Sequence, residues 1–514
     1  MYTLSEQQQN VLTKFDKGEN MFLTGSAGTG KSFLIHKMYT STVALSYKEI
    51  QICAMTGIAS VLLNNFSRVT CKAKTIHSWS GIQLCNTDRE SIIRRVLKKK
   101  RVCNEWKKIH ILIIDEVSMM SCYMFDILEE LARTIRKNAR PFGGIQVIFT
   151  GDMFQLPPIG DGGIPESYPF CFESSRWLGV FPETNHIELT HIYRQNDPVY
   201  INLLNRVRLG EITEEDKAVL KARIGLDNTG VVLTKLFPIR INVDRINQYE
   251  FNKIQEPEFH FPLKGSTGLK TWLESGEPFS KDVVAVCQQA SMTDLEQEVQ
   301  ILKSQLPYCV ENLVLKKGAV VMCVANLDIE RGICNGSQGR ILNILVDQIR
   351  MANVNGLIQP VKMDIPVVEF NNGVIYDGFE VKYWQSQNIP SVAIGQVPLI
   401  LSWASSIHKS QGMTLSHAEM DLGNQVFEYG QAYVALSRVK SLDGLYLTHF
   451  NPTKIKANPR VVEFYKQIKS WNECIPRDTD TKKLETETTD LAIPSTENSD
   501  VKKITVFSRY NLSV

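Results

Sequence analysis

A glycine-rich stretch of eight residues constrains the fold of this chain more than any other feature. Gly25-Ser-Ala-Gly-Thr-Gly-Lys31-Ser32 fits the phosphate-loop pattern of a glycine, four residues and Gly-Lys-Ser/Thr. Residues 20–24 before it read as a short buried strand, and residues 33–38 after it as a helix. Glycines let the backbone curl, so that its N–H groups face phosphate oxygens at a helix N-terminus. The alternative, a chance glycine-rich turn, is disfavoured by the flanking strand and helix.

The residue types in this loop predict ATP and Mg²⁺ as cofactors. Lys31 places a positive charge near the β- and γ-phosphates, and the hydroxyl of Ser32 is a hard oxygen ligand suited to Mg²⁺. The predicted nucleotide-binding residues of the loop are Gly25, Ser26, Ala27, Gly28, Thr29, Gly30, Lys31 and Ser32.

Two carboxylates follow a second apolar run. Residues 111–114 read as a buried strand that ends at Asp115 and Glu116. In phosphate-loop ATPases an aspartate in this position holds the Mg²⁺ shell, and the adjacent glutamate is a candidate base for the attacking water. The alternative is that the pair caps a helix. The phosphate loop upstream favours the catalytic interpretation.

Three more polar residues suit a triphosphate. Gln155 lies in a polar turn after the strand predicted at 147–150, where its amide could reach a γ-phosphate or the attacking water. Arg194 ends a further strand, and Arg438 follows a helix in the second half of the chain. A planar, permanently ionised guanidinium suits the charge of a transition state.

The order of these segments predicts the fold class. Strands and helices alternate in the first half, which predicts a parallel sheet covered on both faces, and the second half repeats the theme. We therefore expect an α/β protein with two lobes and nucleotide in the cleft between them. Between 342 and 398, short alternating segments and Asn-Gly turns at 355–356 and 372–373 predict a small inserted β-barrel. The tail from 475 to 514 is polar and expected to be disordered up to about residue 500.

Composition sets wider limits. A chain of 514 residues is too long for one core. No apolar run reaches the roughly 18 residues of a membrane span, and the N-terminus resembles neither a signal nor a transit peptide. Eleven cysteines without a Cys-x-x-Cys pair favour reduced thiols and disfavour zinc. A net charge of +2 leaves room for a basic groove, so a nucleic-acid partner is compatible with it.

Other segments admit two interpretations each. Gln8, in a predicted helix at 4–12, could read an adenine edge or lie on a solvated face. His77 and Trp79 could contact a single strand, but packing is the stronger interpretation of these residues alone. The basic run at 94–108 is by default a solvated helix face.

Taken together, these motifs resemble the Pif-one-type (petite integration frequency) DNA helicases, in the superfamily-one group that moves 5′ to 3′ and includes RecD. The resemblance runs from residue 4 to about 447. Its motifs lie at 25–32, 75–82, 115–119, 151–158, 396–412 and 433–438, and the segment 128–146 resembles a signature that separates this family from RecD.

The resemblance implies roles for matching positions. Gln8 would read adenine, Gln155 would sense the γ-phosphate, Arg194 and Arg438 would be arginine fingers, and Gly412 would lie at the nucleotide. The positions in motifs that usually line the single-strand path are Thr56, Gly57, His77, Trp79, Phe154, His408 and Lys409.

The resemblance also implies a domain plan. A RecA-like domain 1A would span 1–197 with a wedge, 1B, at about 62–76, and a RecA-like domain 2A would span 198–474 with an SH3-like domain 2B at about 343–395. Departures in the motif around Met55 and at Ser405-Ser406 bear on unwinding detail and leave the ATP site intact.

We therefore expect an ATP-dependent 5′→3′ DNA helicase of replication, recombination, repair or genome maintenance, a monomer when free. Its partners would be single-stranded DNA and 5′-tailed duplexes, with four-stranded guanine structures and RNA–DNA hybrids left open, and no membrane. Rival hypotheses are an ATPase that remodels proteins, a nucleic-acid-binding scaffold without catalysis, and an RNA or RecD-like motor. Nucleus, mitochondrion and a viral replication site all stay open as locations.

Overall fold

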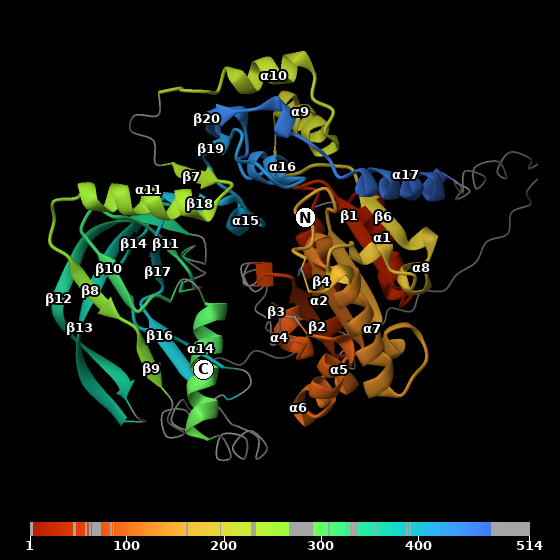
Figure 1. The fold of residues 1–514 in the computed structure, drawn as a ribbon, viewed down its shortest axis with the longest axis horizontal. Helices are drawn as coiled ribbons and strands as arrows, with labels where there is room; N and C mark the ends of the chain where they lie inside the picture. Colours follow the sequence, from red (N-terminus) through yellow and green to blue (C-terminus); the bar gives the residue numbers. More distant parts are fainter. Residues whose placement is uncertain are drawn as a thin grey trace, which may run out of the picture. The chain divides into compact units, whose positions relative to one another are not determined.

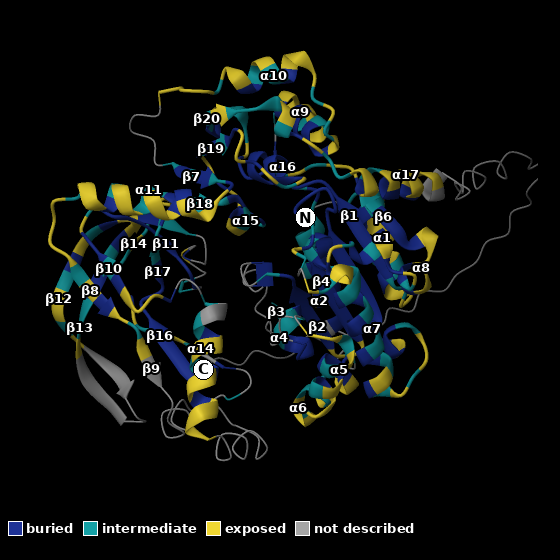
Figure 2. Cartoon of the chain, viewed as in Figure 1, coloured by how far each residue is buried: buried dark blue, intermediate teal, exposed yellow. Residues whose placement is uncertain are grey.

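A six-stranded parallel sheet forms the centre of the first lobe, in the strand order β3-β2-β4-β5-β1-β6. Every residue of β1, β2, β4 and β5 is buried, as expected for strands covered on both faces (Figure 2). The strands are β1 Met21–Gly25, β2 Ile50–Ala54, β3 Lys74–Thr75, β4 Ile111–Asp115, β5 Gln146–Gly151 and β6 His186–Leu189.

The computed structural model describes residues 4–44, 48–56, 59–60, 63, 73–82, 85, 87–160, 163–195, 197–227, 233–266, 291–306, 309–325, 327–328, 331, 333, 337–354, 357–386, 389 and 392–473. The predicted wedge at 62–76 therefore lies largely outside the described residues. Gly57, the turn at 355–356 and the tail at 475–514 lie outside them too. None of the described helices is both long enough and apolar enough to cross a bilayer.

Helices cover both faces of this sheet (Figure 1). Because successive side chains of a strand point to opposite faces, Phe22 joins one core with Phe125 and Trp177, whereas Leu23 joins the other with Leu34. The helices are α1 Glu6–Asp16, α2 Lys31–Ala44, α4 Ile76–Ser80, α5 Arg89–Leu97, α6 Lys100–Lys108, α7 Cys122–Arg136 and α8 Trp177–Val180.

Local capping fixes where two of these helices begin. At α1, the Ser5 side chain accepts from Gln8 N at 3.2 Å, and Gln8 Oε1 accepts from Ser5 N at 3.1 Å, which completes a capping box. At α7, the Ser121 hydroxyl accepts from Met124 N at 3.2 Å. Both signals are readable from the sequence alone.

The second lobe is built on a smaller parallel sheet of four strands, in the order β18-β7-β19-β20. Two parallel sheets with helices confirm the predicted α/β fold class. The strands are β7 Thr234–Phe237, β18 Ala404–Ser406, β19 Ala418–Leu422 and β20 Leu445–Phe450. The helices are α9 Pro198–Leu209, α10 Glu214–Lys221, α11 Arg240–Lys253, α15 Ile407–Ser410 and α16 Gln431–Leu436.

Antiparallel strands are inserted between β7 and β18, as predicted, but over a longer segment than 343–395. The five-stranded sheet β14-β13-β12-β11-β17 needs partners from outside that range, because β12 pairs with β11 and β11 pairs with β17. The turn at 372–373 joins two of its strands, with Gly373 at φ +80°. The sheet's strands are β11 Val320–Cys323, β12 Gln338–Val354, β13 Leu357–Phe370, β14 Ile375–Tyr376 and β17 Leu399–Leu401.

Two smaller antiparallel sheets and a helix complete this insertion. A three-stranded sheet has the order β15-β16-β9, and a two-stranded sheet pairs β10 with β8. These elements are β8 Phe259–Pro262, β9 Lys264–Ser266, α14 Met292–Gln305, β10 Asn312–Leu315, β15 Lys382–Gln385 and β16 Ala393–Gln396.

The helix α17, Pro459–Glu473, corrects the predicted domain boundary. It was assigned to the second lobe with the rest of 198–474, but it packs on the first lobe (Figure 1). The Phe464 ring stacks on Phe172 with centroids 4.1 Å apart, and the Tyr465 hydroxyl accepts from Met153 N at 3.2 Å. The position of this helix in the sequence predicts that it belongs to the second lobe. Tertiary packing, however, decides which lobe its apolar face contacts.

Candidate nucleotide site

The carboxyl ends of four neighbouring strands, β4, β5, β1 and β6, deliver most of the predicted catalytic residues to one edge of the sheet. A cavity of about 1430 Å³ opens at this edge. The first lobe lines it with residues 27–32 of the phosphate loop, Asp115, Glu116, Gln155 and Arg194, and the second lobe with Gly412 and Arg438. The structure therefore brings most of the predicted nucleotide residues together around the cavity, whereas Gln8, Gly25 and Ser26 do not line it.

The phosphate loop curls around its own lysine. Lys31 Nζ donates to the carbonyl oxygens of Gly25 at 2.7 Å and Ser26 at 2.9 Å. Burial lowers the pKa of Lys31, while the carboxylates of Asp152, Glu116 and Asp115 oppose that shift.

A glycine is required in this loop at position 28. Gly28 has φ +89°, and a Cβ there would lie 2.5 Å from Cβ of Arg194. Tyr193 N donates to Gly28 O at 2.8 Å, so the segment after β6 packs directly on the loop.

Asp115 and Glu116 lie side by side with different environments. Burial and the adjacent Glu116 raise the pKa of Asp115 to about 6, although hydrogen bonds from Thr150 Oγ1 and Glu116 N favour its ionised form. Glu116 has a left-handed backbone at φ 58°, which is uncommon for a residue with a side chain. Glu116 lines the cavity, and Gln411 Nε2 donates to its carboxylate at 3.0 Å.

The residues present fit a magnesium ion that a nucleotide brings with it. Both donors to Asp115 use Oδ1, so within the described residues Oδ2 stays without a hydrogen-bond partner. The Ser32 side chain lines the same cavity. No group of three or more His, Cys, Asp or Glu that could hold a metal occurs in the described part of the chain. Two oxygen ligands suit Mg²⁺, which takes its remaining ligands from phosphates and water.

The side chains of Gln155, Arg194 and Arg438 differ in how far they already have partners within the protein. Gln155 is 5% exposed, and its buried Oε1 has no hydrogen-bond partner among the described residues. Burial lowers the pKa of Arg194, and Glu116 opposes the shift. Gln155, which lines the cavity, thus has a buried polar atom without a partner among the described residues.

Arg438 is 1% exposed and held by its own lobe. It donates from Nε to Val434 O at 2.8 Å, from Nη1 to Met413 O at 3.2 Å and from Nη2 to Ser437 Oγ at 2.7 Å. Burial and repulsion from Arg194 lower its pKa to about 10, and Glu116 opposes the shift. These hydrogen-bond acceptors are all neutral, so the positive charge of the Arg438 guanidinium is not fully compensated.

Two residues, Gln8 and Tyr193, lie beside Gly30 of the phosphate loop. Gln8 Nε2 lies against Gly30, where a Cβ would approach it to 3.0 Å, while its Oε1 is taken by the capping box. Tyr193 lines the cavity, is 48% exposed and lies 3.7 Å from the same Cβ position. Sequence reasoning missed Tyr193, and its place directly before Arg194 was the available signal. Gln411 was missed as well, although it directly precedes Gly412.

Two of the predicted DNA contacts are wrong in this structure. Trp79 is 3% exposed and packs on Trp106 with ring centroids 4.5 Å apart. Phe154 is also 3% exposed, and its ring lies 4.6 Å from that of Tyr465. Both rings belong to the core, so neither presents a face on which a base could stack. The sequence of a polar motif does not indicate whether an aromatic side chain within it points into the core or toward solvent.

The other predicted DNA contacts that fall within the described residues are more accessible. His77 is half-buried, and burial lowers its pKa to about 4. Thr56 is half-buried, and its hydroxyl accepts from Ala59 N at 3.2 Å. Lys409 is exposed, and His408 stacks on Phe427 with ring centroids 5.9 Å apart.

Phe427, which sequence reasoning missed, is 63% exposed and extends this face of the second lobe. Desolvation and the nearby Arg240 lower the pKa of Lys409, the residue after His408, while the carboxylate of Asp244 opposes the shift. An exposed ring beside cations is the arrangement that single-strand binders use for bases and backbone.

Comparisons with family models, curated proteins and solved structures all agree on one family. The family described as PIF1-like helicase matches residues 3–218, and the DNA helicase Pif1 2B domain matches residues 301–344. The second match begins before the predicted 343–395, as does the antiparallel insertion itself.

Curated relatives span most of this chain. The ATP-dependent DNA helicase PIF1 of Danio rerio is 36% identical over 91% of this chain, which spans 64% of that protein's length. The chain thus covers less than two thirds of that longer relative. The ATP-dependent DNA helicase Pif1 of Bdellovibrio bacteriovorus is 32% identical, over 90% of this chain and 92% of its own length.

Solved structures agree with this assignment. The crystal structure of Pif1 helicase from Candida albicans is 31% identical, with a TM-score of 0.72 over 91% of this chain and 100% of that one. A Bacteroides Pif1 helicase in complex with ADP-AlF3 and ssDNA is 25% identical, with a TM-score of 0.59 over 91% of this chain and 98% of that one. On these matches the chain belongs to the PIF1-like helicases.

Proposed function

We propose that this protein is an ATP-driven motor that moves 5′→3′ on single-stranded DNA and separates duplex DNA. One observation carries the proposal: a single cavity joins the phosphate loop, Asp115, Glu116 and Gln155 of one lobe to Arg438 of the other. Because both lobes line the cavity, the change of a bound nucleotide from ATP to ADP alters the contact between the lobes. Relatives named ATP-dependent DNA helicases support ATP as the nucleotide and DNA as the partner.

The residues of the cavity divide the work of hydrolysis among them. The loop N–H groups and Lys31 bind the phosphates, and Glu116 is placed to take a proton from the attacking water. The unpaired Oε1 of Gln155 accepts a hydrogen bond from that water. A bound magnesium ion, held by Ser32 and Asp115, supplies charge neutralisation at the phosphates. Tyr193 offers a ring face to the adenine, next to Gln8.

The arginines convert nucleotide state into lobe movement. Arg194 comes from the first lobe and Arg438 from the second, and each lies in the cavity with its charge poorly compensated. A γ-phosphate supplies the missing counter-charge and draws the lobes together. Hydrolysis removes it and the lobes relax. Alternating grip on DNA then gives directional stepping.

The DNA track on the second lobe is proposed at His408, Lys409 and Phe427. Stacking of an exposed ring on successive bases does not depend on sequence, and Lys409 with Arg240 suits the backbone phosphates. The Bacteroides helicase in complex with ssDNA supports a single strand as the partner. We place the activity in DNA replication, recombination, repair or genome maintenance, with guanine quadruplexes and RNA–DNA hybrids as further candidate substrates for a protein that is monomeric when free.

The decisive experiment is strand separation on duplexes that carry only a 5′ or only a 3′ single-stranded overhang, with and without ATP. We expect unwinding of the 5′-tailed duplex only, and ATPase activity that single-stranded DNA stimulates and added salt weakens. Lys31→Ala is the control, because it removes the charge at the phosphates and leaves the DNA face unchanged.

A protein-remodelling ATPase is the alternative that this assay separates. It predicts ATP hydrolysis at the same rate with and without oligonucleotides, and no displaced strand. That pair of results would overturn the proposed function.

A further inference from the structure

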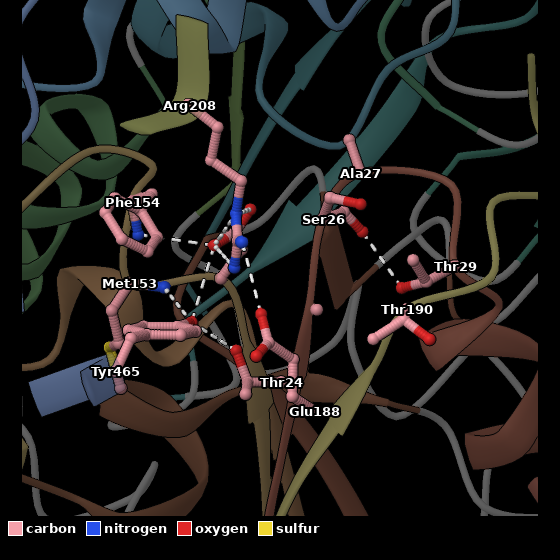
Figure 3. Close-up of polar contacts among 12 residues, drawn as sticks. Thr24, Ser26, Ala27, Thr29, Met153, Phe154, Glu188, Thr190, Arg208 and Tyr465 are labelled. Atoms are coloured by element: carbon pink, nitrogen blue, oxygen red, sulfur yellow. Dashed lines mark hydrogen bonds and ion pairs between the residues drawn. The ribbon is translucent and has the colours of Figure 1, made fainter. Parts of the chain in front are cut away.

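A buried network of charged and hydroxyl groups lies beside the phosphate loop (Figure 3). At its centre, Asp152 is fully buried and receives three hydrogen bonds of 2.9 to 3.1 Å from the guanidinium of Arg208. Arg208 also pairs with Glu188 at 3.2 Å, and its guanidinium lies over the rings of Phe154 at 4.5 Å and Tyr465 at 4.9 Å. The charge on Asp152 is thus compensated by Arg208 of α9, a helix of the second lobe.

The second lobe also reaches this network through Tyr433, on α16. Its hydroxyl donates to Asp152 Oδ2 at 3.0 Å and accepts from the backbone N–H of Ala27 at 3.0 Å. Ala27 belongs to the phosphate loop, and Tyr433 is only 2% exposed. Because ionised Asp152 can only accept and Ala27 N–H can only donate, a single neutral hydroxyl satisfies both.

The rest of α16 is fixed between the lobes as well. Gly430 precedes the helix, and a Cβ there would lie 2.3 Å from Phe154 O and 2.6 Å from Gln155 O. Near the other end, the Tyr200 hydroxyl of α9 donates to Leu436 O at 2.6 Å. Arg438 follows two residues later, so the helix links the turn that carries Gln155 to the arginine in the cavity.

We propose that Tyr433 is a positioning residue for ATP hydrolysis, whose hydroxyl fixes α16, and through it Arg438, relative to the phosphate loop. This rests on the proposed function, in which Arg438 stabilises the transition state. Arg438 donates to Val434 O of the same helix, so a displacement of α16 moves the guanidinium with it. The effect is on geometry at the reacting phosphate, because Tyr433 does not line the cavity.

The first test compares Tyr433→Phe with Tyr465→Phe. Both changes remove one buried phenol hydroxyl that contacts Asp152. Tyr465, however, lies on α17 and donates to Asp152 at 3.5 Å. Its hydroxyl also hydrogen-bonds with Thr24 and Met153 N of the first lobe. We expect Tyr433→Phe to lower kcat of DNA-stimulated ATPase by roughly 10²-fold, the effect of displacing a catalytic group by about 1 Å, with KM for ATP unchanged. Tyr465→Phe should lower the melting temperature and leave kcat unchanged.

A double variant tests whether Tyr433 acts through Arg438. If it does, Tyr433→Phe combined with Arg438→Ala should turn over no more slowly than Arg438→Ala alone. If Tyr433→Phe does not fold, Tyr200→Phe releases the other end of α16 and should show the same fall in kcat.

Three results overturn the inference: equal kcat in wild type and Tyr433→Phe, equal loss in Tyr433→Phe and Tyr465→Phe, or fully additive losses in the double variant. Each of these presupposes a wild-type protein that hydrolyses ATP. A wild type without ATPase activity overturns the proposed function instead, so the two failures are distinguishable.

Discussion

Gln411 Nε2 donates a hydrogen bond of 3.0 Å to Oε2 of Glu116, although 295 residues separate the two in sequence. Glu116 directly follows β4 of the first lobe, and Gln411 directly follows α15 of the second. The same short segment carries His408 and Lys409 on the proposed DNA face. The hydrogen bond therefore connects the candidate catalytic base to the segment that carries the proposed DNA contacts.

Replacing Gln411 with alanine is expected to impair turnover with little effect on ATP binding. A hydrogen bond to a charged group contributes about 1.5–3 kcal/mol, so kcat should fall by roughly 10- to 100-fold. Steady-state ATPase assays at saturating single-stranded DNA measure the change. Ser118→Ala is the matched control, because it removes the weaker contact of Gln411 at 3.5 Å and keeps the bond to Glu116. Equal rates for wild type and Gln411→Ala would remove Gln411 from this role.

Arg438→Ala should retain ATP binding and lose nearly all turnover. An arginine finger contributes roughly 10³–10⁵ in rate, because it meets charge that develops only in the transition state. Binding of a fluorescent ATP analogue and single-turnover hydrolysis separate the two effects. Arg438→Lys is the control that keeps the charge and removes the planar fork. Turnover near that of wild type in Arg438→Ala would contradict the assignment.

Two phenylalanines should respond in opposite ways to truncation. Phe427→Ala removes an exposed ring and is expected to weaken single-stranded DNA binding by about 1–3 kcal/mol, with the melting temperature unchanged. Phe154→Ala removes a core ring and should cost about 3–5 kcal/mol of unfolding free energy. Fluorescence anisotropy and thermal unfolding provide the two readouts. A Phe427→Ala variant that binds DNA as tightly as wild type would contradict the proposed track.

His186 should make stability fall in acid. Burial lowers its pKa to about 4, and Trp177 Nε1 donates to its Nε2 at 2.8 Å, so the added proton would face another donor. The unfolded chain, with a pKa near 6.5, binds that proton first, so this stability is complete above pH 6.5 and is lost as the pH falls to about 4. The loss is on the order of 3 kcal/mol.

Chemical denaturation of wild type and His186→Gln between pH 7 and pH 4 measures this contribution. The variant should lose about half of the acid slope that the two buried histidines contribute. His77, whose pKa is also lowered to about 4 by burial, keeps a slope of the same sign and similar size. Identical slopes in the two proteins would show that His186 is not the group responsible.

The nucleotide site is the part of this protein that sequence determined most fully. The spacing from Gly25 to Ser32 encodes the loop by itself, since glycine conformations and a helix start are local properties. Apolar runs ending in Asp115 or before Gln155 predicted parallel strands, and parallel strands bring their carboxyl ends to one edge. The structure places these residues around one cavity without any long-range information having been needed.

Tertiary structure alone decided which aromatic side chains point to solvent and which elements meet across the lobes. Trp79 and Phe154 are core residues and Phe427 is exposed, although their local sequences do not distinguish these environments. The packing of α17 on the first lobe and the contacts of Tyr433 and Gln411 join segments hundreds of residues apart. Local sequence fixes backbone conformation and periodicity, whereas the partner of a buried face or a buried polar atom is settled only by how the whole chain packs.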